Sequence, residues 1–439
     1  MDLDFHNQDL FPLGTTVDNS GNLEIGGCST QTLVRNFGTP LYVYDETTIR
    51  LMCRTFIDEF SSRYPNTRVA YASKAFLNTK MAKIINGEGL GFDVVSGGEI
   101  AVTNAASVPP DKIYFHGNNK TPKELDYALE SDIGTIVVDG FHELEQLEQM
   151  AKLKNIKPEI MLRLSPSVDA HTHHHTTTGI LDVKFGFSIE TGESTIAIRK
   201  TLASKHLDLK GIHFHLGSPL FDLEPYSLAI DTVLEYLAPF MSEGLHLREF
   251  STGGGFAIGY VQDQPPPPIY SYAEVITSML KNKCQELGIP EPLLVIEPGR
   301  AIAGRAGVAL YSVGVIKHIP AVRTYVSLDG GMGDNIRPAL YGASYEAVAA
   351  NRMNEEPNEI ITLAGKYCET GDILIKDIAL PELHSGDIVA IPSSGAYCFA
   401  MSSNYNMNPR PAIVLVKNGE ASLIRRRETY EDLTMCDLI

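Results

Sequence analysis

The sequence has little cysteine and no long apolar run. No two of its six cysteines form a CxxC pair, which excludes a zinc knuckle or a dense disulfide framework. No uninterrupted apolar stretch approaches the ~18 residues that a membrane-spanning helix needs. The first segment, MDLDFHNQDLF, lacks the basic stretch and apolar core of a secretory signal. We therefore expect a soluble, cytoplasmic protein that does not act in a membrane.

Basic residues are also in short supply. The chain has 36 Lys and Arg against 54 Asp and Glu, which gives a formal net charge of −18. A field of this sign repels nucleic acid and anionic lipid surfaces, so neither is an expected partner. A few local arginines can still hold a small anionic substrate.

Apolar residues are plentiful enough for a large core, since 44% of the 439 residues are hydrophobic, and this length suits two domains. From residue 68 to 299, short apolar runs alternate with segments of helical period. This rhythm predicts a closed (β/α)8 barrel, with an open doubly wound sheet as the alternative. The eight strand-like runs are RVAYAS (68–73), GFDVV (91–95), IYFHG (113–117), TIVVD (135–139), IMLRLS (160–165), GIHFHL (211–216), REFST (248–252) and LLVIE (293–297).

Strand-like runs dominate beyond residue 305, and long helices are scarce there. Short pieces of the same kind, NLEIGG and PLYVYD, occur near the N-terminus and are expected to join this β-rich part. We therefore predict an α/β plus all-β protein with a TIM-type barrel at 46–305. Residues 1–45 and 306–439 should form a second domain, a β-barrel-like or sandwich structure.

Functional groups of such a barrel lie at the C-terminal ends of its strands. Lys74 follows the first strand, where desolvation would lower its pKa and expose an amine suited to a Schiff base. A lysine whose stem packs while its head reaches solvent is the plainer interpretation. Asp93, at the end of the second strand, could pair with that amine or be an ordinary strand-end aspartate.

Two histidine-rich stretches follow. In VDAHTHHHTTTG (168–179), His171, His173 and His175 lack a neighbouring acidic or cysteine set, so we predict a polar loop and no metal site. In HFHLGS, strand alternation places His213 and His215 on one face. One of these imidazoles could stack on a flat cofactor ring, while the other could be a core histidine.

The seventh and eighth strands end in STGGGF (251–256) and IEPGR (296–300). Three glycines let backbone N–H groups approach a phosphate at a frequent barrel position, although a tight turn explains them equally well. The carboxylate and arginine of IEPGR could serve a protonated ring nitrogen and an anion. A lysine, a stackable histidine, a phosphate loop, a carboxylate and an arginine are together what pyridoxal phosphate requires.

The sequence also resembles the diaminopimelate decarboxylases, which belong to the alanine-racemase-like (fold-type III) pyridoxal-phosphate enzymes. The resemblance extends over nearly the full chain. The matching stretches are YASKA, FDVVSGGE, DAHTH…TG…KFG, HFHLGS, GGGF, EPGR, DGGMGDNIRPALYGA, CETGD and GAYCFAMSSNYN.

This resemblance implies roles for particular residues. Lys74 would form the imine with pyridoxal 5'-phosphate, Asp93 would support it, His215 would stack on the ring and Glu297 would meet the pyridine nitrogen. The further cofactor-binding residues that it implies are Ser218, Gly253, Gly254, Gly255, Gly299, Arg300 and Tyr397. The substrate-binding residues that it implies are Arg300, Arg337, Tyr341, Glu369 and Tyr397.

The stretch GKYCETGD (365–372) would be structural if considered alone. In the resembled family, the cysteine and glutamate of this stretch, Cys368 and Glu369, reach into the neighbouring subunit's site, which implies a homodimer with shared active sites. Cys368 would then protonate the carbon that loses carbon dioxide, and Glu369 would accept the distal ammonium of the amino-acid substrate. The implied reaction is decarboxylation of meso-2,6-diaminopimelate to L-lysine, the last step of lysine biosynthesis.

Ser73, Pro219 and Arg305 depart from the family pattern, since they stand where an apolar residue, a glutamine and a small or amide residue are usual. The stretch STGGG also departs from it, because it replaces a more usual acidic-apolar lead-in. A same-fold decarboxylase of ornithine, lysine or a carrier-bound glutamyl unit therefore remains the alternative. A racemase would want a second base facing Lys74. A non-catalytic pyridoxal-phosphate carrier would leave CETGD unexplained.

Overall fold

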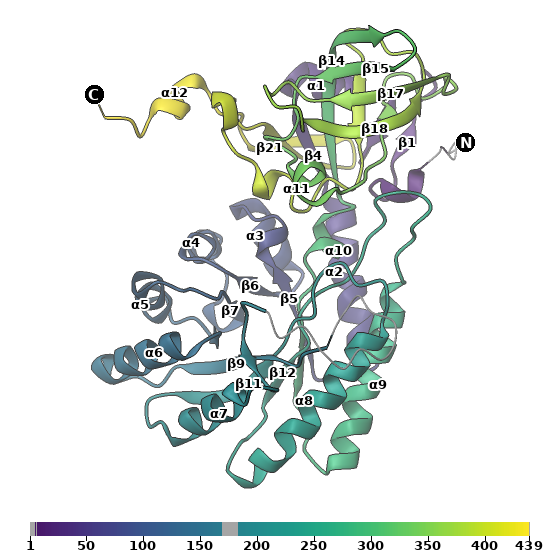
Figure 1. The fold of residues 1–439 in the computed structure, drawn as a ribbon. Coiled ribbons are helices and arrows are strands. Elements are labelled where there is room, and N and C mark those ends of the chain that lie inside the picture. The colour runs from purple at the N-terminus through teal and green to yellow at the C-terminus, as the bar shows by residue number, and fades with distance from the viewer. Residues whose placement is uncertain (1–4, 6, 169–182, 439) are drawn as a thin grey trace. The chain divides into compact units, whose positions relative to one another are not determined.

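The computed structural model describes residues 5, 7–168 and 183–438, so His171, His173 and His175 lie outside the described residues. The chain forms two compact units. We call the first the barrel unit (52–257 and 267–299) and the second the β unit (1–51, 258–266 and 300–439). Figure 1 shows the strands and helices of each unit.

Eight parallel strands close into a ring in the barrel unit. Each strand pairs with the next, β8 pairs with β9, and the last strand, β13, returns to pair with β5. This closure confirms the predicted barrel and excludes the open sheet. The strands are β5 (Thr67–Ala72), β6 (Gly91–Val94), β7 (Ile113–Phe115), β8 (Thr135–Val138), β9 (Glu159–Ser165), β11 (Asp208–His213), β12 (Glu249–Ser251) and β13 (Leu293–Ile296).

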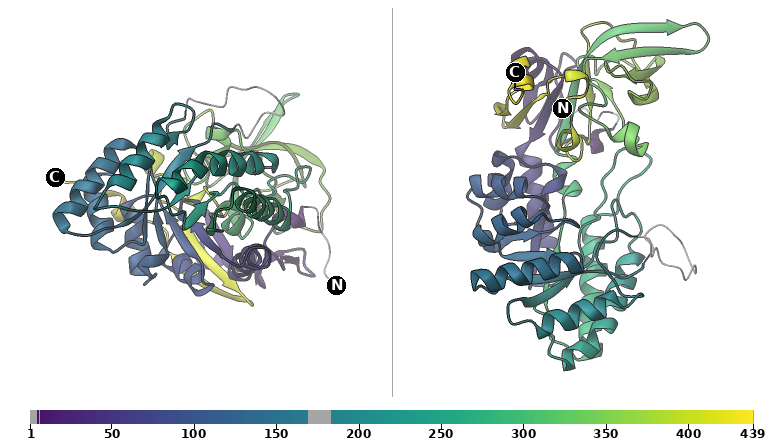
Figure 2. Two further views of the ribbon diagram at one scale, coloured as in Figure 1. Left: turned by 90° about the horizontal axis from the view of Figure 1, so that it is seen from below. Right: turned by 60° about the vertical axis from the view of Figure 1, so that its left-hand side comes forward.

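Helices follow these strands and surround the ring (Figures 1 and 2). They are α3 (Thr79–Gly87), α4 (Gly97–Ala105), α5 (Pro122–Glu130), α6 (Phe141–Lys154), α7 (Glu193–Ala203), α8 (Glu224–Ser242) and α9 (Ile269–Leu287). The two-residue strand β10 (Phe187–Ser188) pairs in parallel with β9 and extends the sheet there. Within the described part of the chain, no helix is both long enough and apolar enough to cross a bilayer.

A buried charged network connects the first halves of several barrel strands. Lys210 Nζ lies 3.0 Å from Glu249 Oε1, and both side chains are buried. The Tyr114 hydroxyl donates to Glu249 Oε2 at 2.9 Å and accepts from Arg68 Nη1 at 2.9 Å. Because buried charges must be paired, Glu249 has a structural role at the end of the barrel opposite the strand ends that carry function.

Replacing Glu249 by Ala is expected to lower the free energy of unfolding by about 1–3 kcal/mol, because Lys210 and the Tyr114 hydroxyl would each lose a buried partner, while Lys210 keeps Glu159 Oε2 at 2.9 Å. Urea unfolding followed by circular dichroism measures this loss. The control is Glu274→Ala, which removes an exposed carboxylate paired with Arg63 at 3.1 Å. That surface pair should contribute about 0–1 kcal/mol. Equal losses in the two variants would contradict the structural role of Glu249.

The β unit is organised by its longest strand, β14 (Gly307–Ile319). This strand pairs antiparallel with β15 (Arg323–Leu328), β19 (Ile388–Ile391) and β4 (Leu41–Asp45). β4 also pairs in parallel with β20 (Ala412–Lys417), so the N-terminal segment supplies an interior strand of this sheet, as the fold prediction requires. The other strands are β1 (Thr16–Val17), β2 (Leu23–Ile25), β3 (Cys28–Ser29), β16 (Val348–Ala349), β17 (Glu359–Ala364), β18 (Ile373–Leu380) and β21 (Glu420–Arg425).

Helices are few and mostly short among the described residues of the β unit. They are α1 (Thr30–Phe37), the start of α2 (Glu46–Ser61), α10 (Arg300–Ala303), α11 (Arg337–Tyr341) and α12 (Tyr430–Thr434). The core packs on the sheet formed by β4, β14 and β20, whose apolar residues, such as Val43, Leu310 and Val414, are completely buried. Residues 1–51 contribute Phe11 and Leu33 to this core.

Candidate functional site

Lys74 lies directly after the first barrel strand, in the short 3-10 helix η2 (Ser73–Ala75). Its two chain neighbours are buried, whereas the Lys74 side chain is exposed. Of the two interpretations of Lys74, this exposure fits a side chain whose head reaches solvent better than an amine desolvated by burial. Its electrostatic neighbours are Asp93, Glu99 and His215.

Two carboxyl groups near Lys74 have raised pKa values. Asp93, in β6, is 3% exposed, and its burial raises its pKa despite the opposing charge of Lys74. Glu99 is fixed at the start of α4: its N–H donates to Ser96 Oγ at 3.2 Å, and its carboxylate accepts from the Val95 N–H at 2.7 Å. Burial raises the pKa of Glu99 to about 7. Glu99 was not among the predicted site residues, although the Ser-x-x-Glu pattern at a helix start would have indicated its position.

The raised pKa of Glu99 predicts a pH-dependent stability. The folded state binds this proton more tightly than the unfolded chain, so the group's stabilising contribution is complete below its ordinary pKa of 4.5 and disappears as pH rises through about 7. Glu99→Gln should therefore raise the thermal midpoint relative to wild type more at a pH of about 8 than at about 5. The exposed Glu190→Gln is the control, and a Glu99→Gln effect that is equal at both pH values would contradict the prediction.

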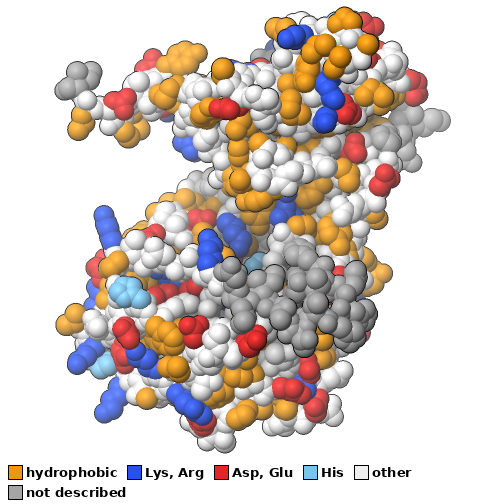
Figure 3. Space-filling view, in the orientation of Figure 1, with side chains coloured by type: hydrophobic (Ala, Val, Ile, Leu, Met, Phe, Trp, Pro, Cys, Tyr) orange, Lys and Arg blue, Asp and Glu red, His pale blue; other side chains and the backbone are white. Residues whose placement is uncertain are grey.

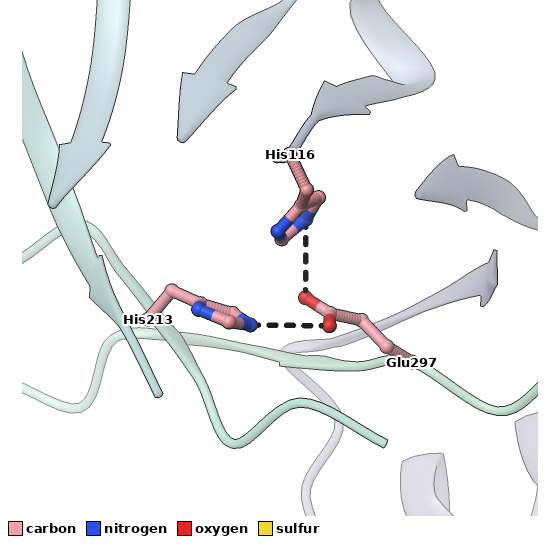
Figure 4. A group of neighbouring side chains, drawn as sticks. All are labelled: His116, His213 and Glu297. Carbon is pink, nitrogen blue, oxygen red and sulfur yellow. Dashed lines mark hydrogen bonds and ion pairs between the residues drawn. The ribbon is translucent and has the colours of Figure 1, made fainter. Parts of the chain in front are cut away.

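The pKa of Glu297 is lowered, whereas that of Asp93 is raised. Glu297 follows β13 and is buried, it accepts a hydrogen bond from Ser251 Oγ at 2.8 Å, and His213 Nε2 lies 3.2 Å away (Figure 4). Burial raises the pKa of Glu297, but the nearby imidazoles and these hydrogen bonds outweigh burial and hold the pKa well below its usual range. One carboxyl group thus favours the protonated form and the other the ionised form, an arrangement typical of acid–base sites.

The histidines near these strand ends are neutral imidazoles, of which His116 and His213 are buried and His215 is partly buried. β11 ends at His213, so the predicted strand alternation stops before His215, which lies in the following loop. The Gly254 N–H donates to His215 Nδ1 at 3.3 Å. Burial lowers the pKa of both histidines and of His116, which follows β7. A neutral imidazole with a fixed orientation suits His215 for stacking on a flat ring.

The glycine loop after β12 is tightly packed. Gly253 and Gly255 have φ values of +70° and +115°, and a Cβ at Gly254 would lie 2.4 Å from a backbone oxygen. The backbone therefore requires glycine for its turn, so the glycines by themselves do not establish phosphate binding. The Leu220 N–H donates to the Gly255 carbonyl at 2.8 Å, which brings the loop that carries Ser218 next to the glycines.

Gly299 explains how Glu297 comes close to the strand that precedes Lys74. A Cβ at Gly299 would lie 2.8 Å from the carbonyl oxygen of Ala72, the last residue of β5. The Ala72 N–H donates to the Pro298 carbonyl at 3.2 Å. The Pro-Gly pair therefore packs directly against the end of β5, and a larger residue in place of the glycine would separate the two segments.

The β unit contains a second set of candidate residues, which we call the arginine–tyrosine cluster (Tyr260, Arg300, Arg337, Tyr345, Tyr397 and Cys398). Arg300 Nη1 donates to the Tyr260 hydroxyl at 2.6 Å. Arg337 lies over the same ring, 4.5 Å from its centroid, and donates to the Tyr345 hydroxyl. The Tyr397 ring lies 4.7 Å from the guanidinium of Arg300. Two predicted anion-binding arginines are thus joined through Tyr260.

The arginine–tyrosine cluster carries positive charge beside neutral groups. Burial raises the pKa values of Tyr260, Tyr345 and Cys398, so all three stay protonated near neutral pH. In the part of the chain that the structure describes, the titratable groups that act on the Arg337 guanidinium are these three neutral side chains, an arrangement suited to a ligand carboxylate. Tyr341, which was predicted to help bind that carboxylate, lies at the end of α11 and is 64% exposed. Sequence reasoning missed the three neutral residues because they lie in different segments.

Cys368 and Glu369 lie on the loop between β17 and β18, and both are exposed. The Cys368 N–H donates to Asn406 Oδ1 at 3.1 Å, and the Tyr405 hydroxyl donates to the Glu369 carboxylate. The loop is fastened by Asp372, which accepts the backbone N–H groups of residues 332 and 367 at 2.6 and 2.8 Å. A well-anchored loop thus presents a thiol and a carboxylate at the surface of the chain.

Two departures from the family pattern have plain structural surroundings. Arg305 Nε donates to the Phe11 carbonyl at 2.7 Å, so this arginine attaches the N-terminal segment within the β unit. Ser73 is completely enclosed beside Lys74. Pro219 follows Ser218 in the loop after β11. The Arg305 contact therefore gives no reason to expect a different substrate.

One group of possible metal ligands occurs among the described residues. The ligand atoms of His116, His213 and Glu297 lie within 4.8 Å of one another. Two imidazoles and a carboxylate are a donor set that transition metals accept. The hydrogen bonds to Glu297 already account for the arrangement, and we assign no metal to it.

Comparison with known proteins identifies the family. The family model "Pyridoxal-dependent decarboxylase, pyridoxal binding domain" matches residues 50–304. A diaminopimelate decarboxylase from Bacillus subtilis is 46% identical over 431 residues, which cover 98% of both chains. The chain belongs to the diaminopimelate decarboxylase family.

Other members support the same assignment. A diaminopimelate decarboxylase from Synechocystis is 43% identical, with 99% of this chain and 94% of the relative covered. The crystal structure of the diaminopimelate decarboxylase from M. jannaschii in co-complex with L-lysine gives a TM-score of 0.91 at 33% identity, with coverage of 97% and 98%. The family resemblance predicted from the motifs is thus confirmed, and pyridoxal 5'-phosphate is the cofactor of a pyridoxal-dependent decarboxylase.

The residues at the strand ends of the barrel unit fit this cofactor chemically. Lys74 offers an exposed amine, His215 a neutral ring and Glu297 an ionised carboxylate. These are the groups that an aldehyde, a flat ring and a pyridine nitrogen require. Gly254 and Gly299 keep the surrounding backbone free of side chains where the segments pack closely.

Proposed function

We propose that this chain catalyses the pyridoxal-phosphate-dependent decarboxylation of meso-2,6-diaminopimelate to L-lysine and carbon dioxide. The observation that carries the proposal is the set of strand-end groups in the barrel unit. An exposed Lys74, a neutral His215 and an ionised Glu297 follow β5, β11 and β13, in a chain of the diaminopimelate decarboxylase family.

Residues of this chain would hold the cofactor as follows. Lys74 would bind its aldehyde, His215 would stack on its ring and Glu297 would meet its ring nitrogen. When bound, the cofactor supplies an electron sink for the electrons left by the departing carboxylate. The residues proposed to contact the phosphate or support the cofactor are Asp93, Ser218, Gly253, Gly254, Gly255, Gly299, Arg300 and Tyr397.

Proton movements are assigned to groups whose environments differ. Asp93 is close to the Lys74 amine, and its raised pKa makes it a proton carrier for that amine. Glu297 favours its ionised form, so it would favour the protonated ring nitrogen of a bound cofactor. Cys368 would donate the proton that replaces the lost carboxylate at the reacting carbon. Its place on an exposed, anchored loop supports this assignment, because the thiol is accessible.

Substrate selection is assigned to the β unit. Arg300 and Arg337 would bind the carboxylate that is not lost, helped by Tyr341 and Tyr397, and Glu369 would bind the distal ammonium. The neutral surroundings of Arg337 support this role, because an unbalanced guanidinium attracts an anion. A site with polar partners at both positions rejects ligands that lack either group, since the partner would stay unpaired.

We propose further that the protein is a cytoplasmic homodimer in which Cys368 and Glu369 complete the active site of the partner subunit. The β unit exposes several large hydrophobic side chains, among them Val315, Val322 and Ile360. Figure 3 shows hydrophobic side chains on the visible face of this unit. Exposed apolar surface of this kind supports association with another chain.

The proposed reaction is tested by incubating the purified protein with pyridoxal phosphate and meso-diaminopimelate and measuring L-lysine by amino-acid analysis. L-Lysine and L-ornithine serve as comparison substrates, and their kcat/KM values should be lower by about 10⁴-fold, because each lacks the distal carboxylate. Faster turnover of L-ornithine would assign the chain to another decarboxylase. Bound cofactor without turnover of these amino acids would favour the carrier alternative.

A further inference from the structure

His116 and His213 are two buried imidazoles to which the proposed mechanism gives no role. They are 5% and 1% exposed, and they lie at the ends of β7 and β11. Their rings make an edge-to-face contact with centroids 4.7 Å apart. Both turn an Nε2 atom toward Glu297, as Figure 4 shows.

Each carboxylate oxygen of Glu297 faces one of these imidazoles. His116 Nε2 lies 3.5 Å from Oε1, and His213 Nε2 lies 3.2 Å from Oε2. Ser251 Oγ donates to Oε1 at 2.8 Å. Since an ionised carboxylate only accepts, His213 carries its hydrogen on Nε2. Rotation of the Glu297 carboxylate would break these contacts. The orientation of its plane is therefore set by residues at the ends of β7, β11 and β12.

His116 also faces a second carboxyl group. Its Nε2 lies 3.8 Å from Asp93 Oδ1, and neither atom has a hydrogen-bond partner among the described residues. His116 therefore lies between Glu297 and Asp93, the two carboxyl groups whose pKa values move in opposite directions. An imidazole in this position separates the ionised Glu297 from Asp93, which favours its protonated form.

We propose that His116 and His213 are positioning residues that hold the Glu297 carboxylate toward the ring nitrogen of bound pyridoxal phosphate. The inference uses the proposed cofactor contact of Glu297 but is independent of the substrate. Partners behind a ligating carboxylate commonly fix its orientation and basicity, as the groups behind metal ligands do. A carboxylate that turns away from the ring nitrogen no longer favours its protonated form.

Cofactor preference tests this role without measuring catalysis. The full-length protein is freed of cofactor and titrated with pyridoxal phosphate and with its deaza analogue, in which CH replaces the ring nitrogen. Wild type should prefer pyridoxal phosphate, and Glu297→Gln sets the scale for a lost nitrogen contact. His213→Asn should reduce the preference by about tenfold, the usual effect of losing a hydrogen bond to a charged group. His116→Gln should reduce it less, because His116 Nε2 lies 3.5 Å from Glu297 Oε1. His246→Asn, at an exposed histidine of the same unit, should keep the wild-type preference.

The ¹⁵N resonance of labelled cofactor gives a second measurement. In the histidine variants the ring-nitrogen resonance should move from the protonated toward the unprotonated position, as in Glu297→Gln. Weaker binding of both compounds with an unchanged preference would overturn the proposal, because it would indicate general packing only. Binding of Zn²⁺ alone that depends on both histidines, with unchanged cofactor preference, would overturn it in favour of a metal site. If His116→Gln does not fold, His213→Asn alone decides.

Discussion

Replacing Lys74 by Ala is expected to abolish covalent attachment of pyridoxal phosphate and to lower lysine formation by at least about 10⁴-fold, the scale of losing a nucleophile. The reason is chemical: among the strand-end groups that the structure describes, Lys74 is the amine placed directly after β5. Borohydride reduction of the protein with its cofactor, followed by mass spectrometry of the peptide that contains residue 74, measures attachment directly.

Lys80→Ala is the matched control for this substitution. Lys80 is an exposed lysine of the next helix, α3, only six positions along the chain. It should keep both the attachment at residue 74 and wild-type turnover. Full attachment in Lys74→Ala, at any other lysine, would contradict the assignment of the amine. Attachment at Lys74 without decarboxylation of diaminopimelate would instead retain the cofactor role and reject the substrate.

The second large effect is expected for Cys368, and it depends on assembly. Cys368→Ala should bind the cofactor normally but lower decarboxylation by about 10²–10⁴-fold, the usual contribution of a positioned proton donor. Cys368→Ser should retain a small activity, because the serine hydroxyl is similar in size to the thiol but is a weaker acid. Cys436→Ala provides the control, because Cys436 is likewise an exposed thiol of the β unit.

Mixing the two inactive variants tests whether the sites are shared. After subunit exchange, half of the dimers contain one Lys74→Ala and one Cys368→Ala chain. If the thiol serves the partner's site, each mixed dimer has one intact site, and activity should return to about a quarter of wild type. If both residues act within one subunit, every site keeps a defect and activity stays absent. Sedimentation of the mixture confirms that dimers are present.

The barrel could be predicted from the sequence because its signal is local and periodic. Each of the eight apolar runs became a strand within a few residues of its predicted ends, since alternating strands and amphipathic helices leave a regular pattern. The positions of Lys74, Asp93 and Glu297 near strand ends followed directly, because parallel strands bring these ends together.

Other features depend on contacts between distant segments and could not be read from the pattern. Tyr260 contacts Arg300 and Arg337 because the segment 258–266 joins the β unit, although the chain before and after this segment belongs to the barrel unit. The contact between His116 and Glu297 arises from the strand order of the closed barrel, which the sequence pattern does not show. The exposure of Lys74 could not be decided from the pattern, which left both a desolvated amine and a head that reaches solvent open.

The position of β4 has a consequence for the order in which the chain can fold. β4 is made early, but its neighbours β14 and β20 belong to the last third of the sequence. The barrel strands β5 to β13 all emerge from the ribosome before β14 does, so the barrel unit can assemble first. Until β14 and β20 have been synthesised, the β4 segment, which is entirely buried in the finished sheet, has no strand to pair with. A chain stopped before β20 would leave one edge of this apolar strand open, and such chains should aggregate.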